Sequence, residues 1–218
     1  MTASDIAKLR MPERFLLIEG IDGSGKDTFA ELCAERIKAR FAFHPAAPLS
    51  IVGQPAFRFD PHGMIRRLIE HGEADCPFDM MCDLLTENRR RHEAEIAGHR
   101  GITICIRGLL TDLATLARVY GRMPGHLLGQ GRAIDRLIVV DVDPDEACER
   151  IRRRGRLPDW RETPENLRFF RDFYRCAASS VSPHSTITVG NTGSVGELDR
   201  HAARLIEDVA REGGNADQ

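Results

Sequence analysis

The sequence predicts an α/β fold, a three-layer sandwich in which helices cover both faces of a five-stranded parallel sheet. Three observations predict it. Five short apolar runs alternate with helical patterns along the chain, as in a parallel sheet with crossover helices. One run, Ile102 to Ile106 (ITICI), is apolar throughout, which is typical of a strand buried on both faces. The first run ends in a glycine-punctuated loop that opens a helix.

The elements are expected in the following order. The first strand covers residues 14–19 and its helix residues 26–41, and a second strand at 49–53 precedes helices at 64–70 and 78–99. Strand 102–106 leads to a helix at 112–120, and strand 137–142 leads to a helix that begins at Pro144. Pro164 opens a helix to about residue 178, before a strand at 185–189 and a last helix that ends near residue 211. Ligands are expected at the edge where the carboxyl ends of these strands meet.

A single domain is expected over residues 14–212, with a lid at about 154–163 and flexible termini at 1–13 and 213–218. The net charge of -2 on 218 residues argues against a general nucleic-acid or acidic-membrane binder. No signal-peptide core or membrane-spanning run is visible, so we expect a cytoplasmic protein. Most of the scattered cysteines are expected to be small buried side chains in a reducing compartment: Cys33, Cys76, Cys82, Cys105, Cys148 and Cys176.

The loop after the first strand, GIDGSGKDT, has the spacing of a phosphate-binding loop between a strand and a helix. Its glycines let successive backbone N–H groups point inward, and the helix N-terminus adds partial positive charge. Lys26 can then reach the outer phosphates of a nucleoside triphosphate. A glycine-rich turn with one exposed lysine is the alternative, but the flanking strand and helix favour phosphate binding. The predicted contacts come from Gly20, Gly23, Ser24, Gly25, Lys26, Asp27 and Thr28.

The residue after the lysine departs from the usual pattern, which has Ser or Thr there to hold magnesium. This chain has Asp27, with Thr28 next. A carboxylate is a suitable magnesium ligand, so Asp27 is the candidate metal ligand. The alternative is that Asp27 caps the helix while Thr28 or a water takes the metal.

Phosphoryl transfer also requires positive charge on the migrating group, and three segments offer arginines. Arg107 directly follows the buried third strand, which places it at the expected ligand edge, unless it is only a solvated strand end. Residues 89–91 lie on the long middle helix, where most of them are expected to be solvated. The segment 150–162 reads as a closing lid, in which Arg154 and Arg156 flank Gly155 and are the candidate catalytic side chains. Trp160 either closes the lid or simply packs.

Over roughly residues 14–211 the chain resembles the thymidylate kinase family of P-loop nucleoside monophosphate kinases. The resemblance is strongest in FLLIEGIDGSGKDTF, in RLIVVDVDPDEACERIRRRGR and in DWRETPENLRFFRDFY. It implies a P-loop NTPase fold, ATP and Mg²⁺, an acceptor nucleotide opposite ATP, and a homodimer through helices. It also implies that Asp22 contacts the acceptor's sugar hydroxyl, that Arg107 lies near the phosphates and that Arg89 belongs to the acceptor pocket. Gly23 stands where some members carry an arginine, and those lacking it use lid arginines.

Several family positions differ in this chain. Gly53-Gln54-Pro55 stands where the family has Arg-Glu-Pro, and Ile106-Arg107-Gly108 where it has Asp-Arg-Tyr. Leu85 stands where a phenylalanine would stack on the thymine. Gln54 and Leu85 are therefore the substrate-binding candidates at altered positions.

The resemblance implies transfer of the γ-phosphoryl group of ATP to dTMP, giving dTDP. Losing an aromatic platform weakens stacking on the base, which is worth about 1–3 kcal/mol. A kinase for another nucleotide, a nucleoside or a small acceptor is therefore an alternative. A catalytically weak nucleotide-binding protein is a further one, which the retained Lys26, Asp22, Arg107 and lid arginines argue against.

Overall fold

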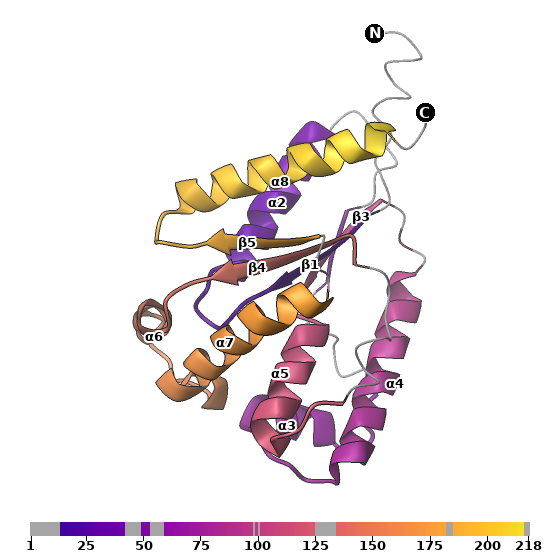
Figure 1. Cartoon of the computed structure of the whole chain (residues 1–218), viewed down its shortest axis with the longest axis vertical. Coiled ribbons are helices and arrows are strands. Elements are labelled where there is room, and N and C mark those ends of the chain that lie inside the picture. The colour runs from indigo at the N-terminus through magenta and orange to yellow at the C-terminus, as the bar shows by residue number, and fades with distance from the viewer. Residues whose placement is uncertain are drawn as a thin grey trace, which may run out of the picture.

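The computed structural model describes residues 14–41, 49–52, 59–97, 99, 101–124, 134–181 and 185–215. A central sheet lies between two layers of helices (Figure 1). All neighbouring strands pair in parallel, in the order β2-β3-β1-β4-β5, which confirms the predicted five-stranded parallel sheet. The strands are β1 (Arg14–Glu19), β2 (Ser50–Val52), β3 (Ile102–Ile106), β4 (Arg136–Asp141) and β5 (Thr186–Gly190).

The helices follow the predicted pattern, with four ends shifted by three or four residues. α4 ends at Ile96 rather than at residue 99, and α7 continues to Val181 rather than to about residue 178. α5 begins at Leu109, three residues before the expected start, because the buried Glu19 carboxylate accepts the backbone N–H groups at its beginning. α8 continues to Asn215, past the expected end near residue 211 and into the tail predicted to be flexible. The helices are α2 (Lys26–Arg40), α3 (Met64–His71), α4 (Phe78–Ile96), α5 (Leu109–Tyr120), α6 (Pro144–Arg153), the 3₁₀ turn η2 (Trp160–Glu162), α7 (Pro164–Val181) and α8 (Val195–Asn215).

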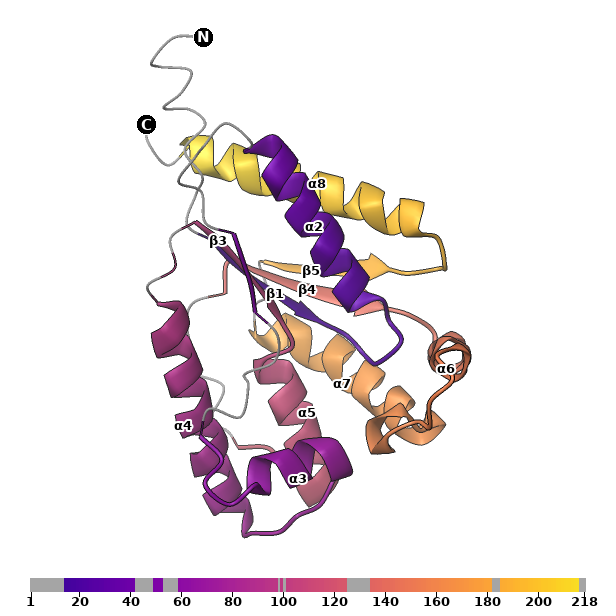
Figure 2. The ribbon, with the colours of Figure 1, turned by 180° about the vertical axis from the view of Figure 1, so that it is seen from behind.

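β1 shows how the sheet faces are divided. Leu16 and Ile18 pack under α2 and α8, whereas Phe15 and Leu17 pack under α5 and α7 on the opposite face. Figures 1 and 2 show α2 and α8 on one side of the sheet and α5 and α7 on the other. Because side chains of a strand alternate between faces, the uninterrupted apolar run of β1 is explained by burial on both sides.

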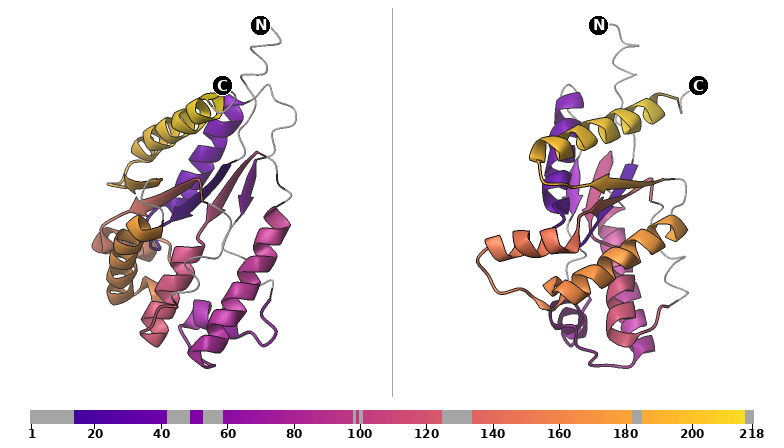
Figure 3. Two further views of the ribbon diagram at one scale, coloured as in Figure 1. Left: turned by 45° about the vertical axis from the view of Figure 1, so that its right-hand side comes forward. Right: turned by 60° about the vertical axis from the view of Figure 1, so that its left-hand side comes forward.

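A third cluster joins α3, α4 and α5 beside the sheet (Figure 3). Leu85 of α4 is fully buried in it, among Met81, Leu113 and Leu116. None of the described helices combines the length and apolar character needed to span a lipid bilayer. The cysteines are free thiols, and Cys33, Cys82, Cys105 and Cys148 are buried, as expected for most of them.

Trp160 docks the lid against α3. Its indole Nε1 donates a hydrogen bond to the Ile69 carbonyl oxygen at 2.9 Å, and its ring meets Phe170 edge-on. Gly72 ends α3 in the left-handed conformation, with φ 69°, directly against the indole ring. Trp160 therefore packs against the body of the protein, and the lid itself stays a prediction.

We predict that Gly72→Ala destabilises the protein more than Gly121→Ala does. Both glycines end a helix with nearly the same positive φ, 69° and 66°, so each alanine costs about 1 kcal/mol of backbone strain. A Cβ on Gly72 would lie 2.7 Å from the Trp160 ring, whereas one on Gly121 meets nothing within 4 Å. The packing clash should add about 1–3 kcal/mol for Gly72→Ala and shift the emission of Trp160, the single tryptophan. Urea denaturation followed by fluorescence measures both, and equal losses would contradict the docking contact.

Candidate active site

The loop between β1 and α2 has the backbone conformation that phosphate binding requires. Gly23 and Gly25 have φ of 80° and 85°, values that an L side chain rarely adopts. Gly25 is also the N-cap of α2, and no side chain caps the helix start. The first N–H groups of α2 are therefore left for a ligand, as in a helix N-terminus that binds phosphate.

The loop is braced from outside by two side chains that the sequence did not single out. Arg150 of α6 donates hydrogen bonds to the Gly23 and Asn191 carbonyl oxygens, both at 3.2 Å. Asn191, which follows β5, donates from Nδ2 to the Ser24 carbonyl oxygen at 2.6 Å. Both loop carbonyls that accept these bonds, those of Gly23 and Ser24, are thereby held in place, and the bonds occupy none of the backbone N–H groups of the loop.

Lys26 is buried beneath the loop. Its Nζ lies 3.4 Å from Asp22 Oδ1, 3.5 Å from the Ile21 carbonyl oxygen and 3.8 Å from Asp27 Oδ2. Burial lowers the pKa of Lys26, and the charges of Asp22 and Asp27 only partly oppose that effect. The Asp27 side chain is 69% exposed, and Thr28 is half-buried. Ser24 Oγ is buried without a partner among the residues the structure describes.

Arg107 and Asp22, predicted from separate segments, meet in an ion pair. Because β3 lies beside β1, the residue after β3 reaches the loop after β1. Burial alone would raise the pKa of the Asp22 carboxyl, but Arg107, Lys26 and Arg161 together hold it well below its usual range. Arg107 has φ 67°, a left-handed conformation that is uncommon for a residue other than glycine.

Glu19, the last residue of β1, was missed by the sequence analysis and is fully buried. Its Oε1 accepts from the Gly108 N–H at 2.9 Å and the Thr111 N–H at 3.4 Å, and its Oε2 accepts from the Thr111 hydroxyl at 2.6 Å. Burial raises the pKa of Glu19 to about 7. The sequence signal that could have revealed Glu19 is an acidic residue at the end of an otherwise apolar strand. The contacts fasten the start of α5, directly after Arg107, to β1.

A pocket opens between the loop and the lid. Thr111 and Tyr174 form part of its wall, and their hydroxyl oxygens lie 3.1 Å apart. Three residues that carry charge, two of them arginines, face the same space. The lining includes Gly20, Asp22, Arg107, Thr111, Arg161 and Tyr174.

The lid arginines divide into two kinds. The side chains of Arg154 and Arg156 are 45% and 49% exposed, and both pair with Glu162. Their catalytic role stays a prediction. Arg161, which the sequence analysis did not single out, lines the pocket instead.

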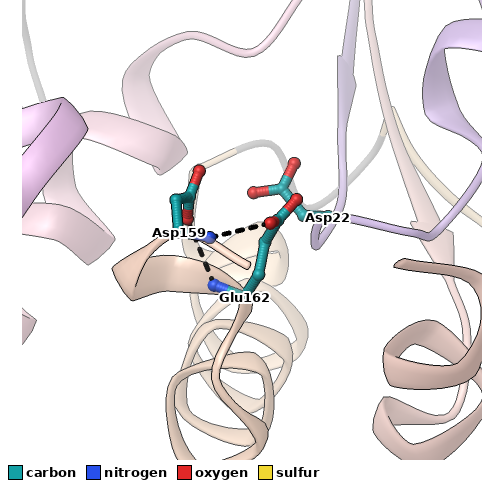
Figure 4. Close-up of side chains that lie close together, drawn as sticks. All are labelled: Asp22, Asp159 and Glu162. Carbon is teal, nitrogen blue, oxygen red and sulfur yellow. Dashed lines mark hydrogen bonds between the residues drawn. The ribbon is translucent and has the colours of Figure 1, made fainter. Parts of the chain in front are cut away.

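Three carboxylates from the loop and the lid lie close together (Figure 4). One oxygen each of Asp22, Asp159 and Glu162 falls within 4.8 Å of the others. The dashed lines join Asp159 N to Glu162 Oε2 at 2.9 Å and Glu162 N to Asp159 Oδ1 at 3.3 Å, a capping box that begins η2. Arg107 and Arg156 pair with two of the three carboxylates, and we assign no metal to the group.

Three of the residues predicted to bind the acceptor are not among the described residues that line the pocket. Gln54 lies outside the described residues. Leu85 is a core residue of the α3–α4–α5 cluster. Arg89 is buried and pairs with Asp112 across α4 and α5, and burial raises the pKa of Asp112 although Arg89 opposes this. The roles of these residues in acceptor binding stay predictions.

Comparisons with known proteins point to one family, although no protein-family model matches the chain. It is 33% identical over 156 residues to the thymidylate kinase of Ruegeria pomeroyi, a match that covers 64% of this chain and 68% of the relative. It is 27% identical over 208 residues to that of Paraburkholderia xenovorans, covering 88% and 97%. The solved thymidylate kinase structure from Ehrlichia chaffeensis covers 89% of this chain and 98% of its own, with a TM-score of 0.59; at 17% identity it shows the fold alone.

Replacing Glu19 by Gln should change how stability depends on pH. Because burial raises the pKa of Glu19 from 4.5 to about 7, the folded state between these pH values keeps a proton that the unfolded state releases. The stability from this group is therefore complete below pH 4.5 and is lost as the pH rises through 7, by up to ~3 kcal/mol. Gln carries no such proton, so Glu19→Gln should gain stability relative to wild type between pH 5 and pH 8.

Urea denaturation at the two pH values measures this difference. Glu31→Gln, an exposed position on α2, is the matched control and should follow wild type. A Glu19→Gln protein whose stability keeps a constant offset from wild type between pH 5 and pH 8 would contradict the raised pKa.

Proposed function

The chain belongs to the thymidylate kinase family, and we propose that it transfers the γ-phosphoryl group of ATP to dTMP, forming ADP and dTDP. The observation that carries the proposal is the meeting of Lys26 and Arg107 at Asp22, on the carboxyl edge of the sheet. Related thymidylate kinases align with most of the chain. Two cations that follow neighbouring strands, Lys26 after β1 and Arg107 after β3, lie beside a helix N-terminus and suit a reaction that moves a negatively charged phosphoryl group.

The donor side is formed by the loop and by α2. The backbone N–H groups between Gly20 and Lys26, together with the N-terminus of α2, would hold the phosphates of ATP. The Lys26 Nζ lies 3.4 Å from Asp22 Oδ1, which is long for a hydrogen bond. Lys26 therefore needs only to turn away from Asp22 to reach the outer phosphates. The buried position of Lys26 excludes water around that charge, which strengthens its attraction for phosphate.

The transfer itself needs positioning more than covalent chemistry. A phosphate oxygen of dTMP forms the new bond to the γ-phosphorus as the bond from that phosphorus to the β–γ bridging oxygen breaks. Arg107 would offset the charge on the migrating group. Asp22 would orient the acceptor through its sugar hydroxyl while keeping Arg107 in place.

Magnesium would be held by Asp27, with Thr28 beside it. The Asp27 carboxylate is exposed at the first turn of α2, next to Lys26, and oxygen donors of this kind suit the ion. Bound there, Mg²⁺ supplies positive charge to the triphosphate.

A kinase for a different acceptor is the second candidate. The observation that favours it is the commitment of Arg89 to a buried ion pair with Asp112, together with the core position of Leu85. The deciding experiment measures ATP consumption with Mg²⁺ against a panel of nucleoside monophosphates, nucleosides and a no-acceptor control. We expect the highest kcat/KM with dTMP. Highest turnover with another compound would select the second candidate. No ATP consumption with any compound of the panel would favour a nucleotide-binding protein.

The expected homodimer and the cytoplasmic location stay predictions. Size-exclusion chromatography with light scattering tests the first.

Lys26→Ala should lower kcat at least a hundredfold, roughly the loss seen when one electrostatic contact to a transition state is removed. Folding should change little, because Asp22 keeps its ion pair with Arg107. Lys38→Ala, an exposed position in the last turn of α2, is the matched control and should retain activity. Unchanged turnover of Lys26→Ala would remove the loop lysine from the mechanism.

Asp27→Asn should raise the Mg²⁺ concentration needed for half-maximal activity, because the amide loses the charge that attracts the ion. A magnesium titration at saturating ATP and acceptor measures the shift. Asp79→Asn, in the first turn of α4, serves as the control. An unchanged magnesium requirement would assign the metal to Thr28 or to water alone.

A further inference from the structure

Two hydrogen-bond donors of the Arg161 side chain are not used within the described part of the chain. Its Nε and Nη1 are buried and have no partner among the described residues. Among the described residues, Nη2 lies 3.5 Å from Asp159 Oδ2. The side chain is 14% exposed and lines the pocket with Asp22 and Arg107. Buried donors without a partner are unfavourable, so the arrangement favours a ligand that accepts them.

The backbone holds Arg161 firmly in that position. Asp159 Oδ1 accepts from the Arg161 N–H at 2.8 Å, as part of the capping box of η2. The neighbouring Trp160 is fastened to the Ile69 carbonyl oxygen. An arginine between two anchored residues is already oriented, so less conformational entropy is lost when it binds a ligand.

The charges around the pocket favour an anion. Two arginines, Arg107 and Arg161, line it together with one acidic residue, Asp22, in the described part of the chain. Asp22 is already engaged by Arg107 and Lys26. Glu162, whose carboxylate lies near Asp22, is engaged by Arg154 and Arg156. Nε and Nη2 lie on the same edge of the planar guanidinium, and their parallel N–H groups match two oxygens of a phosphate group.

We propose that Arg161 binds the phosphate group of the acceptor nucleotide, an assignment that rests on the proposed kinase function. The pocket side of Asp22 is the acceptor side in that function, and Arg161 faces Asp22 there. The half-exposed Arg154 and Arg156 have their carboxylate partner and do not share this geometry.

The experiment compares dTMP with thymidine, which differ by the phosphate alone. Binding to the full chain is measured by titration calorimetry for wild type, Arg161→Gln, Arg161→Lys and the control Arg153→Gln, an exposed arginine at the end of α6. Charge-assisted hydrogen bonds are worth about 1.5–3 kcal/mol, so Arg161→Gln should weaken dTMP binding roughly 10- to 150-fold. Thymidine binding should not change. Arg161→Lys, which keeps the charge but loses the fork, should fall between.

The possible results distinguish a failure of the Arg161 inference from a failure of the proposed kinase function. If dTMP and thymidine affinities fall equally in Arg161→Gln, or dTMP affinity is unchanged while wild type phosphorylates dTMP, the inference fails and the function stands. If the activity panel selects another monophosphate, the same comparison is made with it and its nucleoside. Wild type that binds no nucleoside monophosphate overturns both. Thermal melting identifies any variant that fails to fold. If Arg161→Gln does not fold, the comparison of dTMP with thymidine is made with Arg161→Lys, and an unchanged dTMP affinity there overturns the inference.

Discussion

The ion pair between Asp22 and Arg107 is the interaction on which the site depends. It joins the loop after β1 to the turn after β3, and it brings the charge of Lys26 into the same place. A buried carboxylate with two cations is balanced only in part, so the local charge stays positive. Removing Asp22 would take away the carboxylate that Lys26 and Arg107 share, leaving Lys26 with Asp27 at 3.8 Å. The same carboxylate thus holds the two cations together and leaves the site attractive to anions.

The position of Arg107 depends in turn on Glu19. A left-handed backbone at a residue other than glycine costs about 1–2 kcal/mol and persists only where the surroundings hold it. Here the Arg107 N–H donates to the Ile18 carbonyl oxygen at 2.8 Å, and Glu19 holds the next residue, Gly108. β1 therefore fixes both sides of the site: the phosphate-binding loop that continues it and the arginine that follows its neighbour.

The sequence was sufficient for the features that depend on local pattern. The apolar runs predicted the strands to within about two residues, and glycine spacing predicted the loop, because both signals lie within one short segment. Contacts between distant segments were not predictable in this way. Arg150 and Arg153 read alike in a basic helix, yet only Arg150 meets the loop, which depends on where α6 packs. Arg161 was overlooked for a similar reason, since docking of Trp160 is what turns it inward.

The bracing of the loop by Arg150 has a mechanical consequence. Because Arg150 ties α6 to the Gly23 and Asn191 carbonyls, that helix and the phosphate-binding loop behave as one rigid part. Trp160 ties the other end of the lid to α3. The chain between them, residues 154–159, contains Gly155, which has φ 71° and no neighbour within 4 Å of a Cβ position. Opening of the predicted lid would break the Trp160 contact with α3, and Gly155 is a position in this segment where the backbone can change direction.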